Sequence, residues 1–380
     1  MKVLYDYQAF TWQKYGGVSN CFAKLISNLP KDVEYEIAIK ECDNVHLKEA
    51  NICDVHPYRL YGDNFITKRF FPGKYRLYRW FTKLFPTLTA DGLNRRAAVH
   101  ALQEGNFDIF HPTFFDPYFL QYIGNKPFVL TIHDMIPELV YERKDDPQVA
   151  RKKLLAEKAS HIIAVSEKTK EDIMDVLHIP EGKISVVYHG APEVITFSNK
   201  RLFDFDYVLF VGGRNQSYKN FQPMVKSIAP ILKKRNVHLI CTGNGFTTNE
   251  KELFTSLGLT GLVHHQYVSD SELGQLYHQA RCFIFPSLYE GFGIPILEAY
   301  KAGCPVLLNN KSCFPEIADD AAVYFELDNY QNTLGEVLDD FLKWSLDTKE
   351  LLLQRQAMRV KLFSWKKSAE RLASIYEKCF

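Results

Sequence analysis

The chain of 380 residues contains no apolar run approaching the roughly 18–20 residues that cross a bilayer. It also lacks an excess of one charge: 46 Lys and Arg residues face 45 Asp and Glu residues, so its net charge of +1 does not favour nucleic acid as a partner. Residues 1–7 have too short an apolar segment for a signal peptide and are typical of a first strand. Together these absences predict a globular cytoplasmic protein.

Paired cysteine motifs are missing as well. The eight cysteines are scattered, no two form a C-x-x-C pair, and several fall in apolar runs where a reduced cysteine acts as a small hydrophobic residue. We therefore expect neither a disulfide framework nor a zinc site, and no bound metal. The G-x-G-x-x-G pattern of dinucleotide-binding dehydrogenases does not follow the first strand, which disfavours that class.

Short apolar runs alternate with amphipathic segments along the whole chain, a pattern typical of parallel sheets covered by helices. We predict an α/β fold with two facing Rossmann-like, doubly wound domains and a cleft between them, at residues 1–195 and 205–362. The linker falls in residues 191–206, where periodicity is weak, and residues 363–380 form a final amphipathic helix. The predicted strands cover residues 2–7, 35–40, 107–111, 128–132, 161–165 and 184–188, and then 207–212, 237–242, 262–268, 282–286, 305–309 and 322–325.

Doubly wound domains bind ligands at the carboxyl ends of their strands. Several candidate functional residues fall at such ends, which supports an enzyme whose active site lies between two lobes: Thr113, His133, Ser166, His189, Gly212, Gly243 and Glu290.

The most informative segment covers residues 285–309, which indicate a strand, a turn, a short helix and a second strand. Pro295 suits the first helical position and Gly303 suits the position just past the helix end. The amides of Gly291, Phe292 and Gly293 suit an anionic ligand, because they lie at a helix N-terminus. The carboxylates of Glu290 and Glu298 suit hydroxyl groups instead, so the segment fits a sugar nucleotide better than it fits two solvated glutamates beside a turn.

The spacing Glu290-x7-Glu298 around Gly-Phe-Gly-Ile-Pro resembles the signature of the retaining GT-B glycosyltransferases of family four. The segment His-Asp-Met-Ile-Pro that begins at His133 resembles bacterial mannosyltransferases of polysaccharide assembly. The resemblance implies that Glu298 holds the ribose hydroxyls, that Glu290 holds hydroxyls of the donor sugar, and that the final helix crosses back to the N-terminal lobe.

Cations follow the first strand of the second half, where Gly213 and Arg214 precede Lys219. An arginine fork and a lysine charge suit a diphosphate, although surface cations after a turn would give the same pattern. Family members place an Arg-x4-Lys pair against the leaving diphosphate, and Arg214 and Lys219 match that pair.

Further roles follow from the resemblance. Gly16 and Gly17, which alone would indicate only a turn, match a glycine-rich loop near the donor diphosphate and the acceptor. His133 is expected to face the donor sugar. The nucleoside is expected against the loops that contain Gly243, Tyr267 and Val268.

Residues 68–85 interleave six cations with aromatic residues and contain no acid. Two interpretations stay open: a helix that lies on an anionic membrane surface, or an aromatic stripe facing the core with a solvated basic face.

The leading hypothesis is a retaining, metal-independent hexosyltransferase without a cofactor, which uses a GDP- or UDP-linked sugar and a saccharide or lipid-linked saccharide acceptor. By family analogy the leaving phosphate takes the acceptor proton, so no Asp-x-Asp metal motif is required. The enzyme would work in the cytoplasm or peripherally at the inner face of the membrane. The alternatives are a nucleotide-sugar-binding protein or an epimerase of the same fold without transferase activity; a phosphorylase would need a pyridoxal phosphate lysine.

Overall fold

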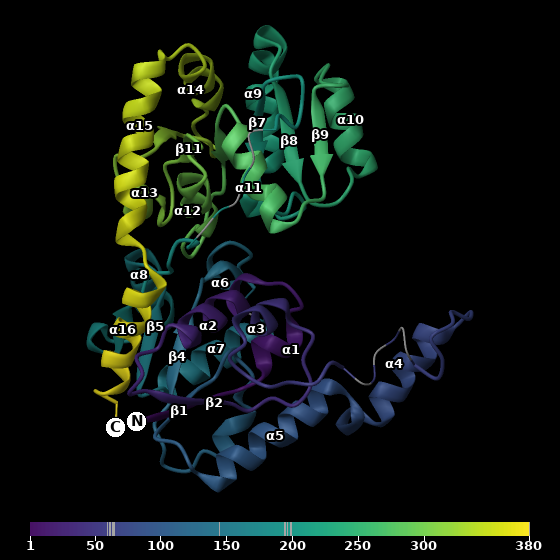
Figure 1. The fold of residues 1–380 in the computed structure, drawn as a ribbon, viewed down its shortest axis with the longest axis vertical. Helices are drawn as coiled ribbons and strands as arrows, with labels where there is room; N and C mark the ends of the chain where they lie inside the picture. Colours follow the sequence, from purple (N-terminus) through teal and green to yellow (C-terminus); the bar gives the residue numbers. More distant parts are fainter. Residues whose placement is uncertain are drawn as a thin grey trace. The chain divides into compact units, whose positions relative to one another are not determined.

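The computed structural model describes the chain except residues 59, 61, 63–64, 144, 194, 196, 198–199 and 380. It divides into two compact units, shown in Figure 1. Unit 1 comprises Met1–Val165, Thr169–Tyr188 and Trp365–Phe380, and unit 2 comprises Ser166–Lys168 and His189–Ser364. Part of the predicted linker at residues 191–206, including residues 194, 196, 198 and 199, lies outside the described residues.

All the strands of unit 1 pair in parallel. One group has the order β2-β1-β3 and the other has the order β4-β5-β6. A parallel bridge between Phe110 and Phe128 joins β3 to the second group. The chain order reverses between β1 and β3, which are neighbours. The strands are β1 (Lys2–Tyr5), β2 (Glu34–Ile37), β3 (Ile109–His111), β4 (Val129–Ile132), β5 (His161–Ala164) and β6 (Ile184–Val186).

The final helix, α16 (Trp365–Tyr376), belongs to unit 1 and packs against α2 (Gly17–Ser27). The Tyr376 hydroxyl lies 2.8 Å from the Tyr5 hydroxyl and 2.6 Å from Nδ1 of His111. These buried polar contacts fix the position of α16, since an unpaired buried hydroxyl is costly. The other helices of unit 1 are α1 (Gln8–Trp12), α3 (Val45–Ala50), α4 (Lys74–Leu84), η1 (Pro86–Leu88), α5 (Ala90–Glu104), η2 (Pro117–Gln121), α6 (Ile136–Leu139), α7 (Pro147–Lys158), α8 (Glu167–Leu177), whose first two residues belong to unit 2, and η3 (Glu181–Lys183).

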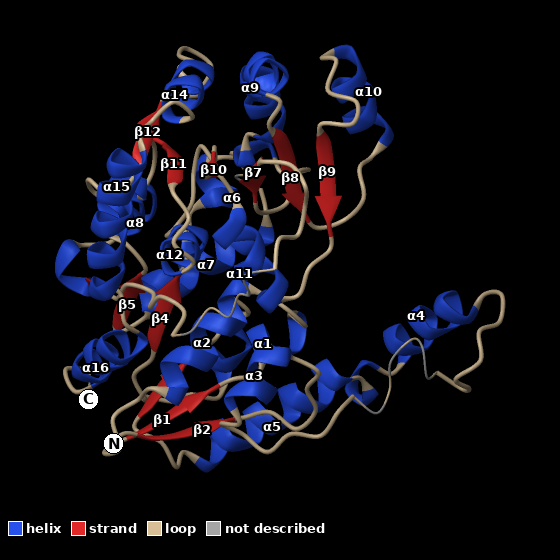
Figure 2. Cartoon of the chain, turned by 45° about the horizontal axis from the view of Figure 1, so that its top comes forward, coloured by secondary structure: helices blue, strands red, loops and turns tan. Residues whose placement is uncertain are grey.

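Unit 2 contains a six-stranded parallel sheet of order β12-β11-β10-β7-β8-β9. Read from β9, the chain order is 3-2-1-4-5-6, the order of a Rossmann domain, with its reversal between β7 and β10. Figure 2 shows the sheet in red with helices beside it. The strands are β7 (Tyr207–Phe210), β8 (His238–Thr242), β9 (Val263–Gln266), β10 (Phe283–Phe285), β11 (Val306–Asn309) and β12 (Val323–Phe325).

The core of unit 2 forms because the apolar side of α9 (Phe221–Arg235) packs on the sheet and on α14 (Leu334–Phe341). Residues at helical spacing on α9, such as Met224, Ile228 and Leu232, are fully buried there. The other helices are η4 (Ser217–Lys219), α10 (Thr248–Ser256), α11 (Asp270–Gln279), α12 (Ile294–Lys301), α13 (Phe314–Ala318), α15 (Leu346–Arg359) and η5 (Val360–Leu362).

The α/β, doubly wound, Rossmann-like prediction is confirmed in each unit, and each of the twelve predicted strands overlaps an observed strand. Pro295 is the second residue of α12 and not the first, because the positive φ of 98° at Gly293 starts the helix at Ile294. The second position also lacks an intrahelical partner for its N–H, so proline costs nothing there. Gly303 lies just past the helix end with a φ of 69°, as predicted.

Among the described residues, no helix has both the length and the apolar character needed to cross a bilayer. All eight cysteines are free thiols in the structure.

Candidate functional site

The reversal of strand order in unit 2 defines the candidate site. The chain leaves β7 toward β8 on one side, whereas β10 continues to β11 on the other, so the loops after β7 and β10 diverge. Ligands of doubly wound sheets bind at this point, beyond the carboxyl ends of the strands. The loop after β7 contains Gly212, Gly213 and Arg214, and the loop after β10 contains Glu290.

Lys219 and Glu290, two predicted site residues 71 positions apart in the sequence, form an ion pair with 2.6 Å between Nζ and Oε1. Ser287 donates a second hydrogen bond, of 2.9 Å, to the same Glu290 oxygen. Both charged side chains are mostly buried. Gly212, with a φ of 131°, lies against the Lys219 side chain, where an L-residue would be strained. A cation and a carboxylate therefore stand together at the point where the loops diverge.

Arg214 is held by four hydrogen bonds within unit 2. Its Nε donates to Oε1 of Glu250 at 2.7 Å, and Nη1 donates to the Thr242 carbonyl at 2.9 Å. Nη2 donates to the carbonyls of Asn244, at 2.5 Å, and of Gly245, at 3.3 Å. The guanidinium thus orders the loop that begins at Gly243, the predicted nucleoside loop, in addition to providing charge.

Glu250 is a residue of this site that the sequence did not single out. Its carboxylate also completes the capping box of α10, accepting from the Thr247 amide at 2.7 Å. Burial raises the pKa of Glu250, but hydrogen bonds from Thr247 and Arg214 outweigh burial and leave that pKa below its usual value. The pattern Thr-x-x-Glu signals a helix start in the sequence. It does not signal the contact with Arg214, which is 36 positions away.

The turn before α12 is fixed through its backbone carbonyls. Ser166 Oγ donates to the Gly291 carbonyl at 2.7 Å, and the Cys313 thiol lies 3.3 Å from the Glu290 carbonyl and 3.1 Å from that of Phe292. A Cβ on Gly293 would lie 3.0 Å from Ile296 and would require a strained φ, so glycine is needed. The carbonyl groups of this turn are therefore held within unit 2, and the Phe292 side chain is buried.

Glu298, on α12, accepts a hydrogen bond of 3.3 Å from the Tyr277 hydroxyl. Burial and the nearby Glu298 carboxylate raise the pKa of Tyr277 well above its usual value, so the hydroxyl stays a donor. Glu298 is half-buried, so its carboxylate can also meet solvent or a ligand.

The predicted nucleoside residues lie at other strand ends. Gly243 follows β8 with a φ of 96° and lies beside the Arg214 guanidinium. Tyr267 and Val268 follow β9 at the edge of the sheet, and Tyr267 is 82% exposed. An Asp-x-Asp sequence does occur, at Asp204 and Asp206. It precedes β7, at the end of the sheet opposite the candidate site, and Asp206 lies 3.3 Å from Nη1 of Arg281.

The remaining predicted residues belong to unit 1. Gly16 is the N-cap of α2, which begins at Gly17, and Oε1 of Gln13 accepts from the Ser19 amide at 3.0 Å. A Cβ on Gly16 would clash with the Gln13 side chain, whereas one on Gly17 would meet nothing within 4 Å. Gln13, which the sequence did not single out, therefore caps the helix end that was expected to bind phosphate.

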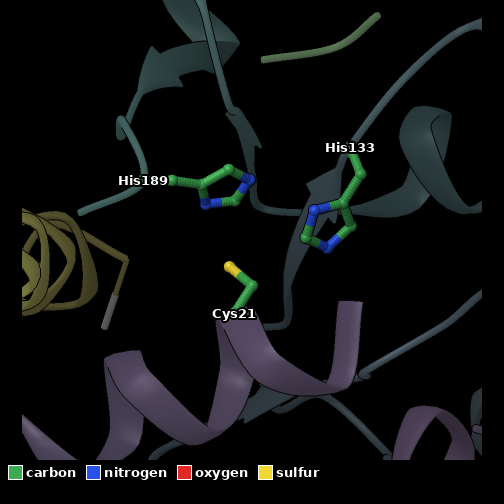
Figure 3. A group of neighbouring side chains, drawn as sticks. All are labelled: Cys21, His133 and His189. Carbon is green, nitrogen blue, oxygen red and sulfur yellow. The ribbon is translucent and has the colours of Figure 1, made fainter. Parts of the chain in front are cut away.

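His133 follows β4, and Figure 3 draws it above Cys21 of α2, which also belongs to unit 1. His189 belongs to unit 2. The His133 ring packs edge-on against Phe22 with 5.9 Å between centroids. Burial lowers the pKa of His133 to about 4, although solvent reaches part of its surface. The imidazole is therefore neutral at pH 7 and can orient a ligand without adding charge.

Thr113 follows β3, and its amide and hydroxyl groups form hydrogen bonds within unit 1. Its amide and hydroxyl both donate to the buried Asp6 carboxylate, at 2.9 and 2.7 Å, and the Tyr118 hydroxyl donates to Asp6 at 3.2 Å. These bonds hold together the two loops at the reversal point of unit 1.

Two family models cover most of the chain: Glycosyltransferase Family 4 matches residues 15–193, and Glycosyl transferases group 1 matches residues 195–352. The chain belongs to the GT-B glycosyltransferases of family four. It is 26% identical over 309 residues to the O-antigen chain mannosyltransferase B of Escherichia coli, covering 75% of this chain and 78% of that protein. It is 24% identical over 313 residues to the MMP alpha-(1->4)-mannosyltransferase of Mycolicibacterium hassiacum, covering 75% and 74%.

Among solved structures, this family four chain resembles HepE of Anabaena in complex with UDP and glucose, with a TM-score of 0.69, 17% identity and 99% of each chain covered. That likeness shows the shared fold. The two family matches show a glycosyltransferase, which the Glu290-x7-Glu298 motif predicted.

Proposed function

We propose that this glycosyltransferase is a retaining, metal-independent hexosyltransferase that moves mannose from a nucleotide diphosphate to a hydroxyl of a saccharide or lipid-linked saccharide. The observation that carries the proposal is the pairing of Lys219 with Glu290 at the reversal point of unit 2, together with the second buried pair of that unit, formed by Arg214 and Glu250. The choice of mannose rests on the mannosyltransferase relatives.

The main catalytic demand is to stabilise negative charge on the departing diphosphate. Lys219 would place its positive charge against the diphosphate, which would replace Glu290 as its partner. The Glu290 carboxylate would then accept hydrogen bonds from hydroxyls of the donor sugar. Arg214 would add positive charge from a fixed position, because its hydrogen bonds already hold the fork. The amides from Gly291 to Gly293 would act in the same direction.

In the reaction the bond between the sugar C1 and the diphosphate oxygen breaks, and a bond from C1 to the acceptor oxygen forms on the same face. The acceptor proton goes to the leaving phosphate, so the step needs no metal or base from the protein. Glu298 would bind the ribose hydroxyls and His133 would orient the sugar as a neutral imidazole. A retaining glycosidase would instead need two carboxyl groups about 5–5.5 Å apart across the scissile bond.

A thermal-shift panel of GDP, UDP and ADP with their sugar conjugates tests the donor. A ligand at one hundred times its dissociation constant adds roughly 2.7 kcal/mol of stability, which such a panel detects. We expect GDP and GDP-mannose to stabilise the protein most. Turnover of the selected donor with a saccharide acceptor, and the anomeric configuration of the product by NMR, then test transfer and retention.

The second candidate is a nucleotide-sugar-binding protein or an epimerase of the same fold. Stabilisation by a sugar nucleotide without release of nucleoside diphosphate in the presence of any acceptor would favour it. An inverted product would refute the retaining mechanism.

A further inference from the structure

Unit 1 carries an α4 arm, which we define as residues 65–88. It comprises α4, η1 and the turn before them, and both Figure 1 and Figure 2 draw α4 away from the strands of its own unit. One side of α4 packs within the arm: Tyr78 and Phe81 contact Phe65, with ring centroids 5.5 and 5.2 Å apart. Lys74 is buried and donates to the Thr67 carbonyl at 2.5 Å. These contacts fix which side of α4 faces away.

The outward side of α4 carries an apolar stripe of Leu77, Trp80 and Leu84. The three side chains follow i, i+3 and i+7 spacing, so they lie in one row along the helix. They are 39%, 59% and 51% exposed, which is unusual for large apolar groups that line up on one face.

A basic stripe of Arg76, Arg79 and Lys83 runs next to the apolar stripe. It has the same i, i+3 and i+7 spacing and is exposed along its length. From Lys68 to Ala90 the chain contains no Asp or Glu, so nothing within the arm's own sequence neutralises these cations. The outward side of α4 is therefore half apolar and half cationic.

We propose that this side of α4 docks on an anionic phospholipid bilayer surface. A helix with adjacent apolar and basic stripes lies in the plane of the interface, where its apolar side chains enter the acyl boundary and its cations meet the headgroup phosphates. Trp80 suits this depth, because its ring is apolar and its N–H needs a polar partner. A second copy of the chain fits less well as an occupant, since it would bring another unneutralised basic stripe against the first.

Flotation with phosphatidylglycerol-containing and pure phosphatidylcholine vesicles tests the proposal. The protein should float with the anionic vesicles and lose most of that binding at high salt, because salt screens exposed charges. In the triple variant Arg76→Gln/Arg79→Gln/Lys83→Gln, affinity should fall about 100-fold, at roughly fivefold per cation. The matched control Arg151→Gln/Lys153→Gln/Lys158→Gln removes three exposed cations from α7 of the same unit and should float like wild type.

Trp80 fluorescence gives a second readout that needs no catalytic activity. Anionic vesicles should shift the emission to the blue, and Trp80→Phe should abolish most of this shift while keeping flotation. Trp80→Ser should weaken flotation itself, whereas Tyr330→Ser, at a 93% exposed position of unit 2, should not. These tests do not depend on the proposed reaction, so a protein inactive toward GDP-mannose can still pass them.

Three outcomes would overturn the proposal. The first is wild-type protein that stays in the bottom fraction of the gradient when anionic vesicles float, and the second is a triple variant that floats as well as wild type. The third is a dimer that depends on the α4 arm and forms without lipid, as measured by analytical sedimentation. The last outcome would identify a second copy of the chain as the occupant. A lowered unfolding temperature identifies a variant that fails to fold. In that case the loss of the blue shift in Trp80→Phe becomes the deciding measurement.

Discussion

Replacing Arg214 with Ala should affect stability and activity through two separable routes. Arg214 and Glu250 form an ion pair of 2.7 Å whose side chains are only 8% and 10% exposed. Removing one partner of a buried pair leaves an uncompensated charge, which costs about 3–5 kcal/mol. For a domain of this size, each kcal/mol of destabilisation lowers the unfolding temperature by about 2–4 °C. Arg214→Ala should therefore lower the unfolding temperature of unit 2 by about 6–20 °C.

The double variant Arg214→Ala/Glu250→Gln separates the two routes. Because it removes both charges, it should be more stable than the sum of the two single variants predicts, by about 1–3 kcal/mol. Its turnover should nevertheless stay at least about 100-fold below wild type, since losing one group that stabilises a developing anion costs about 2.7–4 kcal/mol. Urea unfolding gives the stabilities, and release of nucleoside diphosphate gives the turnover.

A control pair in the same unit calibrates the effect. Arg281 and Asp206 lie 3.3 Å apart with side chains 38% and 50% exposed, and exposed pairs contribute about 0–1 kcal/mol. Arg281→Ala should therefore change neither stability nor turnover appreciably. If the Arg214→Ala/Glu250→Gln variant recovered turnover together with stability, Arg214 would serve only to neutralise Glu250 and hold its loop, and its proposed role at the diphosphate would be wrong.

The other predictions concern the glutamates, metals and pH. Glu298→Gln should weaken binding of the free nucleoside diphosphate in calorimetry, whereas Glu290→Gln should spare it and reduce sugar transfer; the reverse pattern would exchange their roles. Transfer should survive EDTA, and loss of turnover restored by Mn²⁺ or Mg²⁺ would contradict the metal-free mechanism. Burial lowers the pKa of His111 to about 3, below about 6.5 in the unfolded chain, so the unfolded state binds more protons between these values and stability falls as pH decreases. His111→Gln should reduce the change in the free energy of unfolding with pH, measured by urea unfolding, by about 1.4 kcal/mol per pH unit. His100 is exposed, so an equal effect of His100→Gln would refute the assignment to burial.

The segment at residues 68–85, which contains α4, shows what the sequence could and could not decide about one element. Its basic and aromatic character was evident, but the sequence left open whether the aromatics face a core or a membrane surface. The structure divides them: Tyr78 and Phe81 pack on Phe65, whereas Trp80 is exposed. Helical spacing assigns residues to faces, but only the surrounding chain determines which face is covered.

The strands could be predicted because each is a short apolar run bounded by polar or turn residues. Five of the twelve ends were predicted correctly, and seven were placed one to three residues too far, as in β7, which ends at Phe210 and not at Gly212. The strand order in unit 2 could not be read from the sequence, because any parallel arrangement would bury the same apolar runs. That order makes β7 and β10 neighbours, so the loops that follow them start side by side and Lys219 can pair with Glu290.

By itself the sequence determined the α/β class, the positions of the strands and the glycosyltransferase motif, because local periodicity and short-range spacing express these features directly. The tertiary structure alone decided which charges neutralise which. Glu250 appeared in the sequence only as part of a helix cap, and yet its carboxylate holds Arg214. Such pairs depend on contacts between residues far apart in the chain, and these are set by how the strands are ordered and packed.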